Sequence, residues 1–104
     1  MITKFYTFTA KFMKEPGTAD GYTVIVPALK GCVTYGDSKR EAEFMAQDAI
    51  KLYLESLIED NETIPTNIRP TQPKKGFTKD VVVGLNQEVT IGFPAYETPR
   101  FTSA

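Results

Sequence analysis

Residues 21–42 read GYTVIVPALKGCVTYGDSKREA, and this stretch decides the fold. Positions 22–26 are rich in β-branched and aromatic residues, which favour a strand. Pro27 and Gly31 then mark a corner, because proline cannot donate to a sheet ladder and glycine favours turns. Residues 32–35 are again apolar and β-branched. The stretch therefore predicts two short strands joined by a tight corner.

The residues after Gly36 predict the start of a long helix. Ser38 can accept a hydrogen bond from the amide of Glu41, whose carboxylate can reach back to the amide of Ser38, as in a capping box. We expect the helix to run to about Asp60 and to end at Asn61, since asparagine tolerates the left-handed conformation found at helix ends. One apolar stripe recurs at three- and four-residue steps: Ala42, Met45, Ala46, Ala49, Tyr53 and Leu57. Further apolar residues lie off this stripe and predict that a second helix surface is covered: Phe44, Ile50, Leu54 and Ile58.

Upstream, residues 3–12 alternate between apolar and polar side chains, which predicts a half-buried strand. Its apolar face consists of Tyr6, Phe8, Ala10 and Phe12. Residues 14–21 contain the turn dipeptides Pro-Gly and Asp-Gly, so this strand and residues 22–26 should form an antiparallel hairpin with a long loop.

Downstream, three prolines between residues 65 and 73 predict a stiff, extended connection. Residues 79–85 read as a strand, 86–87 as a turn and 88–93 as a further strand, with a loose tail from Pro94. The expected fold is α+β: a two-layer sandwich of one long helix on an antiparallel sheet in the order β-β-β-α-β, with an extra C-terminal strand. We divide the chain into a core (1–66) and a connection plus hairpin or arm (67–104), which belongs to the same domain or to a dimer interface.

The composition narrows the class of function. A chain of 104 residues with a net charge of −1 is one domain without a basic field for nucleic acid. It has no histidine, and we expect its single cysteine, Cys32, to be a buried hydrophobe, so we expect no catalytic site, no metal and no cofactor. No apolar run suits a membrane or a secretion signal, which predicts a cytoplasmic protein. Residues 1–62 carry ten acidic and seven basic side chains, an imbalance that suits a basic partner.

The central stretch resembles the HicB family of antitoxins, with similarity over roughly residues 5–66. The family pattern is carried by Gly21, Tyr22, Pro27, Leu29, Gly31, Cys32, Thr34, Gly36, Ser38, Glu41 and Ala42. The resemblance implies a reduced RNase H-like sandwich without a nuclease centre. It also implies a non-catalytic protein that binds and masks a small, basic, mRNA-cleaving toxin of the HicA type. Many family members add a DNA-binding helical segment, but residues 67–104 read as strands, so DNA binding by this chain alone is not expected.

The residues of the family pattern are interpreted as structural, and three loop carboxylates as candidates for contact with a basic partner: Glu15, Asp20 and Asp37. Val81, Val82 and Val83 lie in an expected edge strand that could join copies into a homodimer or larger homo-oligomer, although burial under the helix explains them equally well. Two alternative functions stay open. One is an oligomer of unknown ligand. The other is a weak RNA-binding module that stacks bases on Phe5, Phe8, Phe12, Tyr22 and Tyr35.

Overall fold

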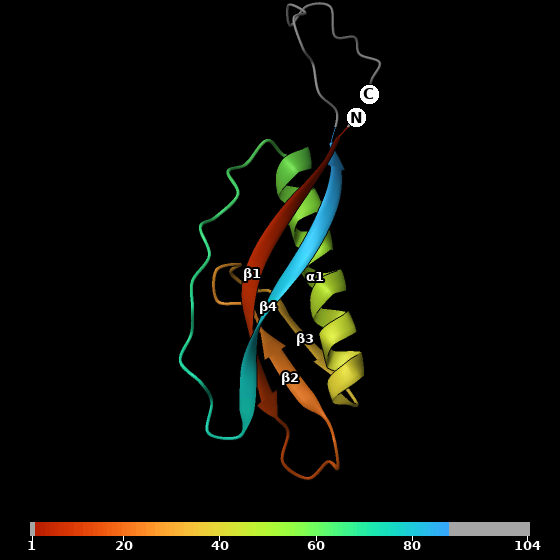
Figure 1. Ribbon diagram of the computed structural model, residues 1–104, viewed down its shortest axis with the longest axis vertical. Helices are drawn as coiled ribbons and strands as arrows, with labels where there is room; N and C mark the ends of the chain where they lie inside the picture. Colours follow the sequence, from red (N-terminus) through yellow and green to blue (C-terminus); the bar gives the residue numbers. More distant parts are fainter. Residues whose placement is uncertain (1, 88–104) are drawn as a thin grey trace, which may run out of the picture.

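The computed structural model describes residues 2–87, which form one antiparallel sheet with a helix across one face (Figure 1). In chain order the elements are β1 (Ile2–Lys14), β2 (Tyr22–Ile25), β3 (Val33–Gly36), α1 (Lys39–Glu59) and β4 (Gly76–Gln87). The strands lie in the order β3-β2-β1-β4. This arrangement confirms the expected α+β sandwich with β-β-β-α-β order. In the part of the chain that the structure describes, no helix has the length and apolar character needed to cross a bilayer.

The last strand differs most from its prediction. β4 begins at Gly76 and pairs with β1 along its whole length, from Met13↔Gly76 to Ile2↔Gln87. The predicted turn at residues 86–87 is therefore wrong, because the pairing partner, which lies far away in sequence, keeps these residues extended. The expected strand at residues 88–93 and the tail after it lie outside the described residues.

The core lies between the sheet and α1. Alternate side chains of β1 point into it, so Phe8, Ala10 and Phe12 are all at most 2% exposed. Phe12 stacks on Phe77 of β4 with ring centroids 4.5 Å apart. The free sheet face contains Phe5, which is 68% exposed. The predicted inward and outward faces of the first strand are thus as expected.

The predicted stripe of α1 faces the core, since Ala42 and Ala46 are fully buried and Ala49, Tyr53 and Leu57 pack against it, but the most buried line is shifted toward Ile50 and Leu54. It follows four-residue steps through Ala42, Ala46, Ile50 and Leu54. Each such step advances about 40° around a helix, so this line winds across α1 as it follows the twisted strands below. The expectation that Phe44 lies under a second cover is wrong within the described residues, because its side chain is 65% exposed.

The connection between α1 and β4 closes an open part of the sheet. β2 covers β1 only at residues 11–14, so the preceding part of β1 has no strand on that side. Asn67 fills this place: its Oδ1 accepts from the Thr9 amide at 2.9 Å, and its Nδ2 donates to Thr9 Oγ1 at 2.9 Å. Thr9 Oγ1 in turn donates to Asp80 at 2.6 Å. These bonds hold the proline-rich connection beside the strand, where Figure 1 shows it running along the sheet.

Candidate partner-binding surface

The corner after β2 is built by the family-pattern residues, which here act through packing. Leu29 is 1% and Cys32 6% exposed, and their burial holds the corner against the core. The backbone closes on itself through Leu29 N to Val26 O (3.0 Å) and Cys32 N to Leu29 O (2.9 Å). Gly31 has a φ of +82°, which favours glycine. Pro27 lies at the end of β2 and is half-buried.

The entry into α1 confirms the predicted cap with one change of partner. Ser38 is the N-cap, and its hydroxyl accepts from the Glu41 amide at 3.0 Å. The Glu41 carboxylate, however, accepts from the amide of Asp37 at 2.5 Å rather than from that of Ser38. Both hydrogen bonds still join residues 37–38 to the first turn of α1, and Ala42, the residue after Glu41, is fully buried.

The remaining pattern residues also take structural positions. Tyr22 is half-buried in β2 and meets the edge of the Phe77 ring at 5.6 Å, while Thr34 is half-buried in β3. Gly21 and Gly36 have no positive φ, so a left-handed backbone does not explain glycine at these positions. Gly36 is required by space, since a Cβ there would lie 2.3 Å from the backbone nitrogen of Ala42, whereas a Cβ on Gly21 would meet the hydroxyl end of the Tyr35 side chain.

Two of the three candidate partner-binding carboxylates converge at one end of the sheet. Glu15 follows β1 and accepts a hydrogen bond from Thr23 Oγ1, and Asp37 follows β3. Partial burial, followed by the negative charges of Asp37 and Glu15, raises the pKa of Tyr35. The charges of Glu15 and Asp37 thus both act on Tyr35, whereas Asp20 is exposed in the β1–β2 loop.

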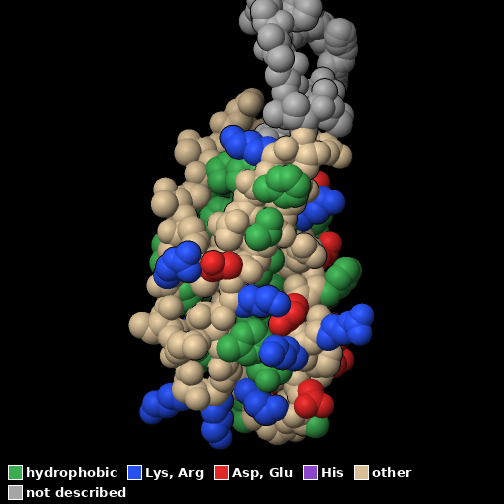
Figure 2. All heavy atoms as spheres, in the orientation of Figure 1, with side chains coloured by type: hydrophobic (Ala, Val, Ile, Leu, Met, Phe, Trp, Pro, Cys, Tyr) green, Lys and Arg blue, Asp and Glu red, His purple; other side chains and the backbone are tan. Residues whose placement is uncertain are grey.

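Basic side chains lie beside Glu15, so this end of the sheet has mixed charge. Lys14 and Lys75 line the same shallow hollow as Glu15, with a volume of about 400 Å³. Lys14 Nζ donates to the carbonyl of Ala19 at 2.7 Å. Figure 2 shows Lys and Arg side chains gathered toward the end of this face that carries the β1–β2 loop.

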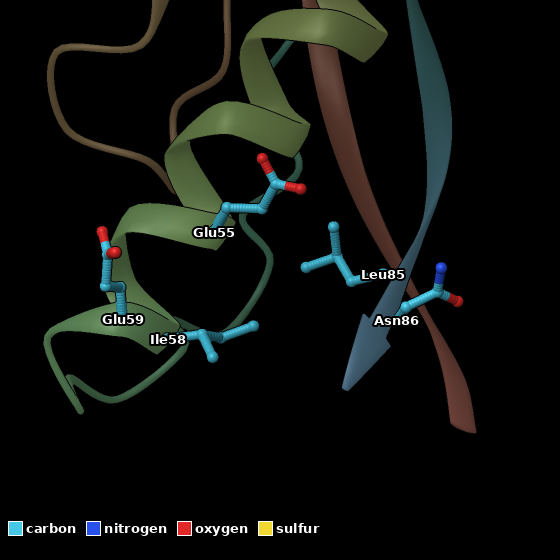
Figure 3. Close-up of a pocket in the computed structure, with 5 residues that line it drawn as sticks. All are labelled: Glu55, Ile58, Glu59, Leu85 and Asn86. Carbon is cyan, nitrogen blue, oxygen red and sulfur yellow. The ribbon is translucent and has the colours of Figure 1, made fainter. Parts of the chain in front are cut away.

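A second acidic feature, not expected from the sequence, lies between α1 and the end of β4 (Figure 3). Glu55 and Glu59 of the helix, with Ile58, Leu85 and Asn86, line a hollow of about 380 Å³, and Figure 3 shows the Glu55 side chain directed toward Leu85. Glu55 and Glu59 are four residues apart, so they share a helix face. The spacing of the two glutamates and a strand at residues 79–85 were visible in the sequence, but the position of that strand beside the end of α1 was not.

The five aromatic residues of the RNA-binding alternative do not form one platform. Phe8 and Phe12 are buried between the sheet and α1, and Tyr22 is half-buried beside Phe77. Phe5 and Tyr35, 68% and 40% exposed, lie on the opposite face near different ends of the sheet. A row of stacked bases therefore has no continuous support here.

The three valines of β4 divide between the two sheet faces. Val81 and Val83 are 8% and 2% exposed beneath α1, whereas Val82 is 49% exposed on the free face. β4 is the edge strand of the sheet, and Gln47 Nε2 donates to the outward carbonyl of Val82 at 2.9 Å. Joining of copies through this strand stays a prediction.

Residues 2–87 contain no group of three or more acidic, cysteine or histidine side chains that could hold a metal ion. Burial raises the pKa of Cys32, which suits a packed thiol rather than a nucleophile. With this geometry established, comparison with known proteins identifies the family.

Residues 11–90 match the model of the HicB-like antitoxin of bacterial toxin–antitoxin systems. The chain belongs to the HicB-like antitoxin family. The match starts later than the resemblance expected from the sequence and continues through β4. Membership confirms the expected family and a non-catalytic, antitoxin-type protein.

Similar proteins agree with this assignment. The chain is 53% identical over 47 residues to UPF0150 protein Ta0767 of Thermoplasma acidophilum, covering 44% of this chain and 68% of that protein. It is 38% identical over 65 residues to antitoxin HicB 1 of Photorhabdus laumondii, covering 58% of this chain and 42% of that protein. The matched part is thus less than half of the longer HicB relative.

Solved structures support the fold. A chain of a toxin–antitoxin complex from Streptococcus pneumoniae superposes with a TM-score of 0.67 at 19% identity, covering 90% of this chain and 84% of that one. The N-terminal domain of the Burkholderia pseudomallei antitoxin HicB gives 0.54 at 19% identity, covering 81% of this chain and all of that domain. The chain therefore has the α+β fold of the HicB N-terminal domain, with one long helix on a four-stranded antiparallel sheet.

Proposed function

We propose that this chain is the antitoxin of a toxin–antitoxin pair and neutralises a small, basic, HicA-type ribonuclease by covering the surface that cleaves mRNA. The observation that carries the proposal is the family match over residues 11–90. The likeness to chains from toxin–antitoxin complexes supports it. Because the toxin acts on mRNA, we place this function in the cytoplasm.

Masking requires a stable surface rather than a reactive one, and this chain offers such a surface. The sheet and α1 enclose a continuous core. The loop that carries Glu15 and Asp20 is closed by hydrogen bonds from the Glu15 amide to the Gly21 carbonyl and from the Thr18 hydroxyl to the Glu15 carbonyl, both 2.9 Å. We propose that Glu15, Asp20 and Asp37 meet basic side chains of the toxin at the loop end of the sheet. Opposite charges at an interface mainly speed association and select the correct partner.

The first experiment tests the pairing itself. The protein encoded next to this chain is expressed in bacteria with and without the full chain, and growth is followed. Binding is then measured by calorimetry with a toxin variant that lacks cleavage activity. We expect growth arrest that the chain relieves, and a stable complex. Unrelieved growth arrest together with no measurable binding would refute the antitoxin proposal for this pair.

The second experiment tests the surface. The triple variant Glu15→Gln, Asp20→Asn and Asp37→Asn should slow association and weaken binding about tenfold at low salt. The matched control removes the same amount of charge elsewhere, through Glu59→Gln, Asp60→Asn and Glu62→Gln, and should bind as the parent does. Equal weakening by both variants would show only a general charge effect, and weakening by the control alone would move the interface to the end of α1.

A further inference from the structure

We propose that Tyr35, on the free face of the sheet, is the anchor at which the toxin docks, and that an arginine side chain of the toxin stacks on its ring beside the carboxylates of Asp37 and Glu15. This inference rests on the proposed antitoxin function and deepens it, because it names the chemical group of the partner and the residue that receives it. Two observations carry it: an exposed apolar patch around the ring, and the acidic charges that act on the ring.

The ring belongs to an apolar patch at the edge of the sheet. Tyr35 and Val33 are 40% and 57% exposed, and they alternate along β3, so both lie on the face away from α1. Ile25 of β2 pairs with Val33 and is half-buried on the same face. Because β3 is the last strand on its side of the described sheet, a partner can approach the patch from the face and from the edge.

The Tyr35 ring is held across the start of β2. A Cβ on Gly21 would lie 2.3 Å from the Tyr35 hydroxyl oxygen and 3.1 Å from Cζ, so the end of the ring lies against the glycine. Thr23, the cross-strand partner of Tyr35, donates its hydroxyl proton to the Glu15 carboxylate. A ring that is already in place loses little conformational freedom on binding, and tyrosine is one of the residue types that dominate interface energies.

The charges that act on the ring are acidic. Partial burial, and then the negative charges of Asp37, Glu15 and Glu41, raise the pKa of Tyr35, and within residues 2–87 no cationic side chain contributes to this shift. None of these three carboxylates forms an ion pair with another described residue. Glu15 accepts from a threonine hydroxyl and Glu41 from a backbone amide, so their charges stay uncompensated.

The lysines nearest in sequence are directed to the other face of the sheet. Lys14 Nζ lies 5.5 Å from the centre of the Tyr22 ring. Lys39 Nζ lies 4.8 Å from the centre of the Phe77 ring. Both rings are on the face that α1 covers. Lys11 shares the free face, but it lies on β1, with β2 between it and β3. The patch therefore attracts a cation of a protein partner and repels the phosphates of a nucleic acid.

Arginine is the cation that suits both parts of this site. Its planar guanidinium group stacks on an aromatic face and donates to carboxylates in a fixed fork, whereas the compact ammonium group of lysine cannot do both. The ring of Tyr35 supplies the aromatic face, and Asp37 and Glu15 supply the carboxylates. We therefore assign an arginine of the basic toxin to this place.

Calorimetry with a toxin variant that lacks cleavage activity measures the role of the ring. Tyr35→Ala should weaken binding about 30-fold or more, and Tyr35→Leu, which keeps an apolar side chain in β3 without a ring, about tenfold. Tyr35→Phe keeps the ring and should lose no more than about threefold. Phe5→Ala is the matched control, because Phe5 is an exposed aromatic residue on the same face near the other end of the sheet, and it should bind as the parent does. Circular dichroism of each variant checks that the fold is kept.

The arginine is tested from the side of the toxin. Each arginine of the toxin is replaced in turn by lysine, which keeps the charge but not the planar group. One of these substitutions should weaken binding to the parent chain about tenfold and binding to the Tyr35→Leu chain hardly at all, because the contact is already lost there. Equal weakening with both chains would place that arginine elsewhere.

Three results would overturn the inference while the parent chain still binds the toxin. These are full binding by Tyr35→Leu, equal weakening by Phe5→Ala, and no toxin arginine whose effect depends on Tyr35. The antitoxin proposal stands in each of these cases, and only the anchor is refuted. A parent chain that does not bind the toxin would refute both.

Discussion

Gly36, the last residue of β3, lies directly beneath the first turn of α1: a methyl group on it would come within 2.3 Å of the Ala42 backbone nitrogen. Backbone atoms cannot move aside as a flexible side chain can, so Gly36→Ala has to push β3 and α1 apart. We expect the free energy of unfolding to fall by about 2–4 kcal/mol. Urea denaturation followed by far-ultraviolet circular dichroism measures the change.

Gly31→Ala is the control for that experiment. Gly31 has a φ of +82°, but a Cβ there would meet no heavy atom of the described chain within 4 Å. Its substitution should cost only the strain of a left-handed alanine, about 1 kcal/mol. If both variants lose the same stability, close packing is not the reason for glycine at position 36.

The cap of α1 gives a second prediction. Ser38→Ala removes the acceptor of the Glu41 amide and should lower the free energy of unfolding by about 1 kcal/mol. Ser38→Gly should cost only a few tenths of a kcal/mol, because glycine is itself an acceptable N-cap. Chemical denaturation of the two variants distinguishes them. A larger loss for glycine than for alanine would show that the capping hydrogen bond is not the source of the effect.

The parts of the fold that were predicted correctly depend on local chemistry. The corner at Pro27 and the cap at Ser38 follow from residues close together in sequence, and the left-handed Asn61, with a φ of 56°, ends α1 as expected. The errors involve partners far away. Residues 86–87 have turn-like composition, but their pairing with Ile2 and Thr3 keeps them in β4.

For the candidate surface, too, the residues could be predicted from local sequence, but their arrangement depends on partners far away in the chain. The sequence supplies loop carboxylates, and only the order of the strands brings Glu15 near Tyr35, where its charge and that of Asp37 raise the pKa of the tyrosine. Lys14, the last residue of β1, adjoins Glu15 in the sequence, but only the fold brings Lys75 to the same hollow, so the acidic character of this end is lower than expected. The predicted stripe of α1 does pack against the core, but the buried side is wider than predicted and extends to Ile50 and Leu54. A helix pattern alone does not contain the twist of the sheet that covers it.

The buried thiol gives a third prediction. Cys32 is 6% exposed, and burial raises its pKa, so the native protein holds little reactive thiolate. The reaction with a disulfide reagent at pH 8 should be slow in buffer and should become fast in unfolding concentrations of urea. A native rate equal to the unfolded rate would show that the corner at residues 27–32 opens freely or does not pack as described.

The connection to β4 depends on the Asn67 side chain. Asn67→Ala removes the acceptor of the Thr9 amide. Thr9 is only 3% exposed, so its amide is then buried without a hydrogen-bond partner. An unpaired buried donor costs about 1–3 kcal/mol, and we expect that loss of stability. Hydrogen exchange of the Thr9 amide should accelerate more than that of amides in α1. Uniform acceleration across the molecule would show a global effect rather than release of the connection.

The titration of Asp80 makes the stability contributed by the Asn67–Thr9–Asp80 hydrogen bonds depend on pH. The hydrogen bond that Thr9 donates lowers the pKa of the Asp80 carboxyl, and Arg69, 3.2 Å away, adds to the shift. A carboxyl whose pKa is lower in the folded chain stabilises the fold above its ordinary pKa of about 4, and this stabilisation is lost as the pH falls through the lowered value. Thr9→Val should therefore flatten the fall in stability below about pH 4, and Arg69→Gln should flatten it less. Urea midpoints measured at several acidic pH values test this order. An unchanged pH profile for Thr9→Val, or a larger effect of Arg69→Gln, would show that the hydroxyl does not control the titration of Asp80.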